Sequence, residues 1–161
     1  MKRVAVLMAK GYEEGETLTI VDLLRRAHIE CHTFYFDDEF VEGMHHMMIK
    51  ADQQFGDEIK DYDVLVLPGG RPGGENLRNN EDVIQMVQYF NQHHKILAAM
   101  CPGTIVLSDA KVIEGKKVTG YTGYEEKLKG GLFQNDVVVY DQNIITSQGP
   151  ATPYPFAFQI I

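Results

Sequence analysis

A cysteine stands where an apolar run gives way to Pro-Gly. In the segment 95–110, KILAAMCPGTIVLSDA, Cys101 is followed by Pro102. Proline is favoured at the first position of a helix, because the N–H group that it lacks has no partner there. A tight strand-to-helix turn would present the thiol at a helix N-terminus, which favours the thiolate. We therefore predict that Cys101 is a reactive thiol of lowered pKa, the alternative being an inert buried cysteine.

The other cysteine, Cys31, opens a predicted strand and is expected to be an inert core residue. The two cysteines lie far apart in the chain and match no zinc, CxxC or disulfide-framework spacing. We expect two free thiols in a reducing compartment and no metal site.

Three carboxyl groups follow the first apolar run, at Glu13, Glu14 and Glu16. A carboxylate at the start of a helix pairs well with the helix dipole, and this capping role is the simplest interpretation. These residues also share a predicted sheet edge with Cys101, so one of them can hydrogen-bond the sulfur. A carboxyl group that is desolvated there has a raised pKa and can donate its proton. The residue types alone do not distinguish the three.

A cysteine hydrolase usually needs a histidine base, and all the histidines precede Cys101. They are His28, His32, His45, His46, His93 and His94. The last two lead into the strand that ends beside Cys101, so a strand of about 3.3 Å per residue places them roughly 20 Å from the thiol. The first two also lie at the amino ends of strands. Only His45 and His46 can reach the site, and a solvated turn is the simpler interpretation of that pair.

A glycine-rich loop, PGGRPGGEN at 68–76, directly follows another apolar run. Its glycines, Gly69, Gly70, Gly73 and Gly74, allow backbone N–H groups to approach an oxyanion or a carboxylate. The loop matches neither GxGxxG nor GxxxxGK[ST], so the sequence argues against a dinucleotide site and a P-loop. A tight turn onto a helix is the alternative.

The elements that position these residues follow from hydrophobic periodicity. Near-continuous apolar runs at 3–8, 63–68 and 95–100 are typical of parallel strands covered on both faces. Between them, apolar residues recur with helical period, and the two predicted faces are Ile20, Leu23, Leu24 and Ala27, and Val83, Met86, Val87 and Phe90. Strands and helices therefore alternate along the chain.

The remaining segments complete a sandwich. Further strands are predicted at 30–36, 136–140 and 143–148. The segment 39–52 looks like a hairpin that pivots near Glu42, and an apolar helix begins at about Thr152. Right-handed crossovers make this a doubly wound α/β fold with a mostly parallel sheet between helices. Ligands bind beyond the carboxyl ends of such strands, where the thiol, the acids and the glycine loop collect.

The length, composition and charge of the whole chain limit the functions that the protein can have. Its 161 residues, 44% of them hydrophobic, suit a single domain over 1–161. A net charge of -8 argues against nucleic acid or an anionic membrane as the main partner. The sequence has no apolar run of about 18 residues and no signal-peptide pattern at its start, so we expect a soluble cytoplasmic protein. The last helix, TPYPFAFQII, lacks a polar final turn, so it is expected either to be truncated or to dock on a neighbour.

Taken together, these segments resemble the DJ-1/ThiJ/PfpI family, in its bacterial DJ-1-like branch, nearly end to end. The matching pieces are LMAKGYEEGETLTIVDLLRRA, YDVLVLPGGRPGGENL, ILAAMCPGTIVLSDA, VTGY and ITSQGPATPYPFAFQII. The resemblance implies a flavodoxin-like sandwich, a homodimer, and an oxidation-sensitive elbow cysteine beside a protonated glutamate. By match, the cysteine is Cys101 and the glutamate is Glu16.

The resemblance also implies a range of functions. Family members are described as cofactor-free glyoxalases, protein or nucleotide deglycases, oxidative-stress proteins and chaperones, and many bacterial ones carry a thiazole-phosphate biosynthesis label. We expect a protein without cofactor that acts on small α-oxoaldehydes or their glycated adducts during stress. The alternatives are a redox-sensing chaperone that works through oxidation of Cys101 and a role in thiazole-phosphate (thiamine) biosynthesis.

Three departures from the family pattern narrow these expectations. Pro102 stands where the peptidase-like branch has a histidine, so proteolysis is not expected. Tyr121 stands where several DJ-1-like members have a histidine, and its hydroxyl is expected to point into the pocket. Pro102 also lacks the N–H that serves the family as an oxyanion donor. We therefore expect the N–H of Gly70, helped by Gly103, to serve, in a pocket that also includes Gly69, Tyr121 and His45.

Overall fold

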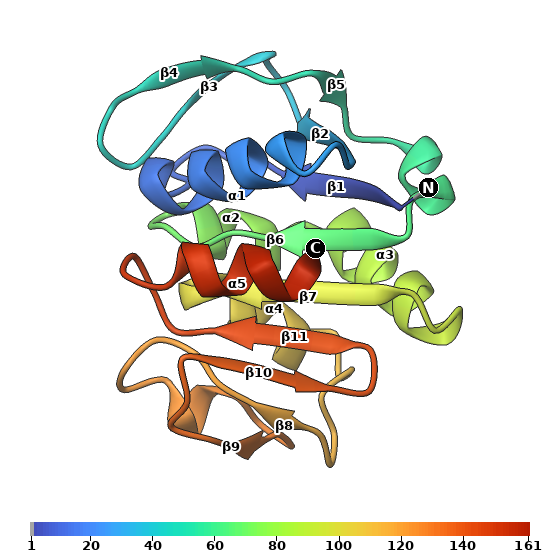
Figure 1. Ribbon diagram of the computed structural model, residues 1–161, viewed down its shortest axis with the longest axis vertical. Coiled ribbons are helices and arrows are strands. Elements are labelled where there is room, and N and C mark those ends of the chain that lie inside the picture. Colours follow the sequence, from blue (N-terminus) through green and yellow to red (C-terminus); the bar gives the residue numbers. More distant parts are fainter. Residues whose placement is uncertain (1) are drawn as a thin grey trace.

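The computed structural model describes residues 2–161, and its centre is one sheet of seven strands (Figure 1). The strands are β1 (Arg3–Leu7), β2 (Glu30–Tyr35), β5 (Gln53–Gln54), β6 (Val64–Leu67), β7 (Ile96–Met100), β10 (Val138–Asp141) and β11 (Ile144–Ser147). They lie in the order β10-β11-β7-β6-β1-β2-β5. The pairing is parallel except between β10 and β11, so the predicted mostly parallel sheet is confirmed.

Helices cover both faces of the sheet, which makes the chain a single-domain α/β sandwich (Figure 1). The helices are α1 (Glu14–Arg26), α2 (Gly73–Arg78), α3 (Glu81–Gln92), α4 (Thr104–Asp109) and α5 (Pro153–Ile160). Successive strand side chains point to opposite faces. Val4 and Val6 therefore pack in one core cluster with α1 and α5, and Ala5 and Leu7 pack in another with α2, α3 and α4.

The strand order explains where a site can form. Omitting the short β5 and the antiparallel β10, the sheet reads β2-β1-β6-β7-β11, which is the flavodoxin-like order. The chain winds outward in one direction from β1 to β2 and in the other from β6 to β11. The crevice at this switch point lies at the carboxyl ends of β1 and β6, with β7 next to them. The residues that follow these three strands are those singled out from the sequence.

Two small additions lie outside the central sheet. The predicted hairpin at 39–52 is confirmed as the antiparallel pair β3 (Phe40–Glu42) and β4 (Met48–Lys50). A parallel pair of two-residue strands, β8 (Lys117–Val118) and β9 (Leu132–Phe133), was not predicted. Strands this short contain no full period of alternation, so the sequence holds no signal for them.

The final helix packs inside the same domain. It buries Phe156 and Ile160 in the core cluster that includes Ile20 of α1, and it leaves Tyr154 and Phe158 exposed. Its start at Pro153 agrees with the predicted start near Thr152. Within residues 2–161, no helix has the length and apolar character needed to cross a bilayer.

Candidate active site

Three strand ends bring the candidate residues together in one pocket. Cys101 directly follows β7, Gly70 lies in the loop after β6, and Glu16 lies in the first turn of the helix after β1. The pocket has a volume of about 380 Å³. It is lined by Glu13, Glu16, Met44, His45, Gly70, Arg71, Cys101, Pro102, Tyr121, Tyr124 and Pro150.

Cys101 occupies the elbow predicted for it. Its backbone has φ of 54°, in the left-handed region that a side chain with Cβ enters at a cost of about 1–2 kcal/mol. The hydroxyl of Thr104 donates a hydrogen bond of 2.8 Å to the Cys101 carbonyl oxygen and so closes the turn. The sequence predicted that Pro102 is the first residue of the helix. Instead, a 3₁₀ turn over Cys101–Gly103 precedes α4, which begins at Thr104.

Glu16 is fully buried against the thiol. Its Oε2 accepts a hydrogen bond of 3.0 Å from the N–H of Gly69, and its carboxyl group contacts Cys101. Its other oxygen, Oε1, has no hydrogen-bond partner among residues 2–161. Burial raises the pKa of Glu16 to about 7, with a further contribution from the charge of Glu13. A carboxyl group of this pKa can both accept and release a proton near neutral pH.

The predicted lowering of the Cys101 pKa is wrong. Cys101 is only 8% exposed, and burial raises the pKa of its thiol. An ionised Glu16 beside it raises the pKa further, while the N–H of Gly70 opposes the rise by hydrogen bonding to the sulfur. The six-residue α4 does not offset these effects, because desolvation of the thiolate is the largest of them.

The three glutamates that the sequence left open have three different roles. Oε2 of Glu13 caps α1 by accepting a hydrogen bond of 2.6 Å from the N–H of Glu16. Glu14 accepts hydrogen bonds from the N–H groups of His45 and Met47 and so holds the β3–β4 hairpin. Glu16 alone contacts the thiol of Cys101.

The predicted glycines differ in what they do. Gly70 lines the pocket with φ of 108°, a conformation suited to glycine, and its N–H reaches the sulfur. A side chain at Gly69 would collide with Cys101 and Glu16, so this glycine permits their close approach. Gly69 and Gly103 were both predicted to belong to the pocket, but neither is among its lining residues, and Gly103 lies against the backbone carbonyls of Leu67 and Pro68.

Of the two histidines within reach, only His45 lines the pocket. Its Nδ1 lies 3.2 Å from Oε1 of Glu14 and 3.5 Å from Oε1 of Glu13. His46 instead pairs with Glu42 at 2.8 Å. The cluster of Glu13, Glu14 and His45 is the one group of metal-ligand type within residues 2–161. It carries no metal assignment, because backbone N–H groups already occupy the oxygens of Glu14.

Cys31 has the inert environment predicted for it. It is 4% exposed in the core beneath α1, and burial raises the pKa of its thiol to about 12. Both cysteines are free thiols.

Two tyrosines and an arginine complete the pocket. Tyr121, which the sequence analysis included, is 43% exposed and lies edge-on to Tyr124, with ring centroids 5.7 Å apart. The guanidinium group of Arg71 donates a hydrogen bond to the hydroxyl of Tyr124. Neither Arg71 nor Tyr124 was predicted from the sequence. A signal for Arg71 was available, because it is the one charged residue between the two glycine pairs of PGGRPGG.

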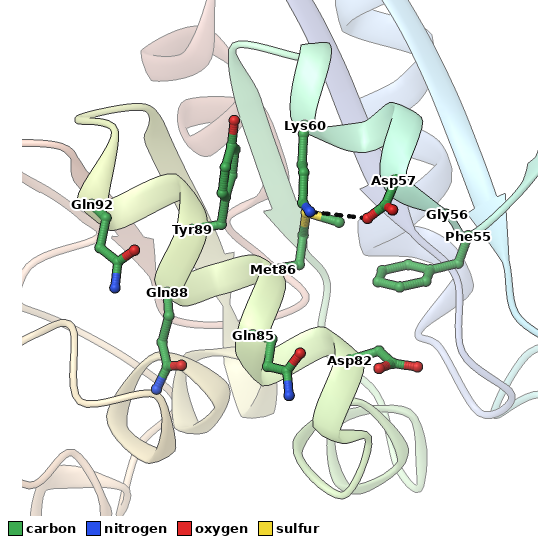
Figure 2. Close-up of a pocket in the computed structure, with 10 residues that line it drawn as sticks. All are labelled: Phe55, Gly56, Asp57, Lys60, Asp82, Gln85, Met86, Gln88, Tyr89 and Gln92. Carbon is green, nitrogen blue, oxygen red and sulfur yellow. Dashed lines mark ion pairs between the residues drawn. The ribbon is translucent and has the colours of Figure 1, made fainter.

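A second pocket, of about 540 Å³, lies between the turn at Asp57–Asp61 and α3 (Figure 2). Its lining is mostly polar and includes Gln85, Gln88 and Gln92 along one helix. Lys60 faces Asp57 in an ion pair of 3.0 Å. No thiol lies among its lining residues, so the chemistry of Cys101 belongs to the smaller pocket alone.

A flavodoxin-like sheet with a cysteine elbow beside a buried glutamate defines a class of α/β proteins with a cysteine-centred site. The similarity of this chain to known proteins supports the same class. Residues 2–161 match the model of the DJ-1/PfpI family, and the chain belongs to that family. The Parkinson disease protein 7 homolog of Danio rerio is 34% identical over 166 residues, which cover 99% of this chain and 88% of that protein.

Solved structures give the same result. The crystal structure of Drosophila melanogaster DJ-1beta superposes with a TM-score of 0.93 at 32% identity, over 99% of this chain and 89% of that one. Toxoplasma gondii DJ-1, described as oxidized, superposes with a TM-score of 0.93 at 28% identity, over 100% of this chain and 89% of that one. The family expected from the sequence motifs is therefore confirmed.

Proposed function

We propose that this protein is a cofactor-free enzyme that converts small α-oxoaldehydes, or their glycated adducts, through Cys101. The observation that supports this most directly is the contact between the thiol and a buried carboxyl group whose pKa is raised to about 7. The N–H of Gly70 hydrogen-bonds the same sulfur, and Gly70 lines the pocket. Nucleophile, proton acceptor and backbone donor thus converge at one point.

The proposed reaction begins with attack by Cys101. Its sulfur bonds to the aldehyde carbon of RCOCHO while the thiol proton passes to Glu16, which returns it to the carbonyl oxygen to give a hemithioacetal. Glu16 then removes the proton on the former aldehyde carbon and delivers it to the neighbouring keto carbon through an enediolate. The aldehyde carbon is oxidised and the keto carbon is reduced, so no external oxidant is needed.

Water completes the cycle. It cleaves the resulting thioester to a 2-hydroxyacid and the free thiol, so that RCOCHO and H₂O give RCH(OH)COOH. The N–H of Gly70 is proposed to stabilise the oxyanion during attack. Because Pro102 offers no N–H, the site lacks a neighbouring donor, whose loss costs some enzymes about a hundredfold in rate, so we expect modest turnover.

The test is the formation of lactate from methylglyoxal by the purified protein. We expect turnover that Cys101→Ala abolishes and that Cys31→Ala leaves unchanged. Equal rates in Cys101→Ala and the unsubstituted protein would disprove the proposal.

A redox-sensing role is the second candidate. The Toxoplasma gondii relative is described as oxidized, and in this chain Gly70 N–H and Glu16 could hydrogen-bond the oxygens of an oxidised Cys101. Peroxide would oxidise the thiolate to sulfenic and then sulfinic acid, with one water released at each step. Mass spectrometry after mild peroxide should show a gain of about 32 Da on Cys101 before the seven methionines react. Oxidation of methionines first would contradict this role.

We further propose that the protein acts as a cytoplasmic homodimer. Phe40, Met47 and Met48 are exposed together on the β3–β4 hairpin, which offers an apolar surface to a second copy. Sedimentation should give the mass of two chains, and Met48→Glu should shift it toward one. Within residues 2–161, the groups that act on the Cys101 thiol are Glu16, Glu13 and the N–H of Gly70, and no histidine is among them, so we do not propose peptidase activity.

A further inference from the structure

The pocket has a cationic wall that the proposed reaction does not yet use. Arg71 follows Gly70 directly, and its exposed side chain lines the pocket that contains Cys101. Among the residues of 2–161 that line this pocket, Arg71 is the one lysine or arginine. Its positive charge therefore lies within the space that a substrate must occupy to reach the sulfur.

Arg71 is held in place by an uncharged partner, and the charge of Glu75 acts on it without forming an ion pair. Its guanidinium group donates to the hydroxyl of Tyr124 and lies 5.6 Å from the centroid of that ring. Tyr124 is only 4% exposed, so it gives the arginine a fixed anchor. Within residues 2–161, no carboxylate lies within ion-pair distance of Arg71, whereas Arg25, Arg26 and Arg78 all have such partners. A guanidinium group has five N–H donors, and the tyrosine uses only part of them.

Two acidic residues, Glu13 and Glu16, also line the pocket, and both are engaged with other groups. Glu13 accepts a hydrogen bond from the backbone of Glu16 and faces His45 at 3.5 Å. Glu16 is buried against the thiol. Arg71 is therefore the group in this pocket that attracts an anionic ligand, and it lines the same pocket as Cys101.

We infer that Arg71 binds a carboxylate on the substrate, so that the preferred substrate is an α-oxoaldehyde with a carboxylate at its far end. The planar fork of arginine matches a carboxylate in a bidentate manner. The carbonyl group is directed to Cys101 and Glu16, and the carboxylate to Arg71. The inference rests on the proposed function insofar as Cys101 is the nucleophile, and it adds the substrate class.

Alkylation of Cys101 tests the anion site without requiring turnover. Iodoacetate and iodoacetamide are nearly equal in size and differ in charge, and with both the sulfur bonds to the CH₂ carbon while iodide leaves. We measure the ratio of their rates at Cys101 by mass spectrometry, in the unsubstituted protein and in Arg71→Met. Because the side chain is exposed and screened, we expect the substitution to lower the iodoacetate to iodoacetamide ratio by about fivefold.

Two further variants separate charge at the site from charge in general. Arg71→Lys keeps the charge and should retain most of the ratio. Arg26→Met removes the same charge from an exposed position of α1, where Arg26 pairs with Asp22, and should leave the ratio unchanged. A ratio that is equal in the unsubstituted protein and Arg71→Met, or that falls equally in Arg26→Met, would overturn the inference.

Turnover then tests the substrate class. With 4,5-dioxopentanoate, an α-oxoaldehyde with a far carboxylate, Arg71→Met should lower kcat/KM about fivefold, and with methylglyoxal it should change kcat/KM less than about twofold. Equal losses on both substrates would overturn the inference and leave the proposed function standing. If neither compound is turned over but the alkylation ratio depends on Arg71, the proposed function fails and the carboxylate site remains.

Discussion

At the scale of single residues, the site depends on one pair of acids that share a buried space. Cys101 and Glu16 are in contact, and burial raises the pKa of both. When one of them ionises, its charge disfavours ionisation of the other, so the two titrate as a unit. The pair therefore releases its first proton near the pKa of about 7 that Glu16 has in this position.

This pairing predicts the pH dependence of thiol reactivity. In the unsubstituted protein, the rate of Cys101 alkylation by iodoacetamide should rise with a midpoint near pH 7, as the pair loses its first proton. In Glu16→Gln no carboxylate accepts the thiol proton while burial still raises the thiol pKa, so the midpoint should move above about 8.5, the value of an ordinary thiol. Glu39→Gln, at an exposed site, is the control. A midpoint near pH 7 in both variants would contradict the shared titration.

The raised pKa of Glu16 also predicts that the stability of the fold depends on pH. The pKa of Glu16 is about 7 in the folded state and near the reference value of 4.5 in the unfolded state. The folded state therefore binds the proton more tightly, which adds to the free energy of unfolding. This added stability is complete below pH 4.5 and is lost as the pH rises through 7. At about 1.4 kcal/mol per pKa unit, the loss is about 3 kcal/mol.

Urea unfolding at several pH values measures this effect. Glu16→Gln cannot ionise, so its free energy of unfolding relative to the unsubstituted protein should rise by about 3 kcal/mol between pH 4.5 and pH 8. A constant difference between the two proteins over this range would show that the carboxyl group is not held in its neutral form.

At the scale of elements, the β3–β4 hairpin forms part of the pocket wall because α1 holds it. Glu14 is 3% exposed and accepts hydrogen bonds from the N–H groups of His45 and Met47. Burial raises the pKa of Glu14, but the hydrogen bonds from the backbone outweigh it and the net pKa is lowered. The sequence predicted the hairpin, but it contained no sign that Glu14 holds it in place.

We predict that Glu14→Gln loosens this hairpin. The amide replaces a carboxylate oxygen with a donor that cannot accept from the backbone, at a cost of about 1–3 kcal/mol. The amide hydrogens of His45 and Met47 should exchange faster in hydrogen-exchange mass spectrometry. Glu39→Gln removes a carboxylate from the same hairpin that pairs with Lys50 at the surface, and it should leave the exchange unchanged. Unchanged exchange in Glu14→Gln would show that other contacts hold the hairpin.

At the scale of the whole molecule, two core layers enclose the sheet, and α5 completes one of them. Phe156 is fully buried between this helix and the sheet, while Phe158 on the same helix is 61% exposed. Phe156→Ala should lower the free energy of unfolding by about 3–5 kcal/mol, because it leaves a cavity. Phe158→Ala should change it by less than about 0.5 kcal/mol. Chemical denaturation measures both, and similar losses would mean that α5 does not pack as described.

The main strands, the α/β sandwich and the convergence of Cys101, the three glutamates and the glycine loop were all predictable from the sequence. Apolar runs and helical periods are local patterns, and the topology rules for parallel sheets place strand ends on one edge. Short-range patterns therefore determined both the fold class and the edge that carries the site.

The tertiary structure decided what each group at that edge does. The raised pKa of Cys101 depends on burial and on the charge of Glu16, which comes from another element of the chain. Glu13 caps its own helix, whereas Glu14 and Glu16 each meet a different partner from another part of the chain. The anchor of Arg71, Tyr124, lies far along the chain, so no local pattern shows that the two residues meet. Sequence patterns carry the local preferences of the chain, whereas desolvation and pairing depend on contacts that exist only once the chain has folded.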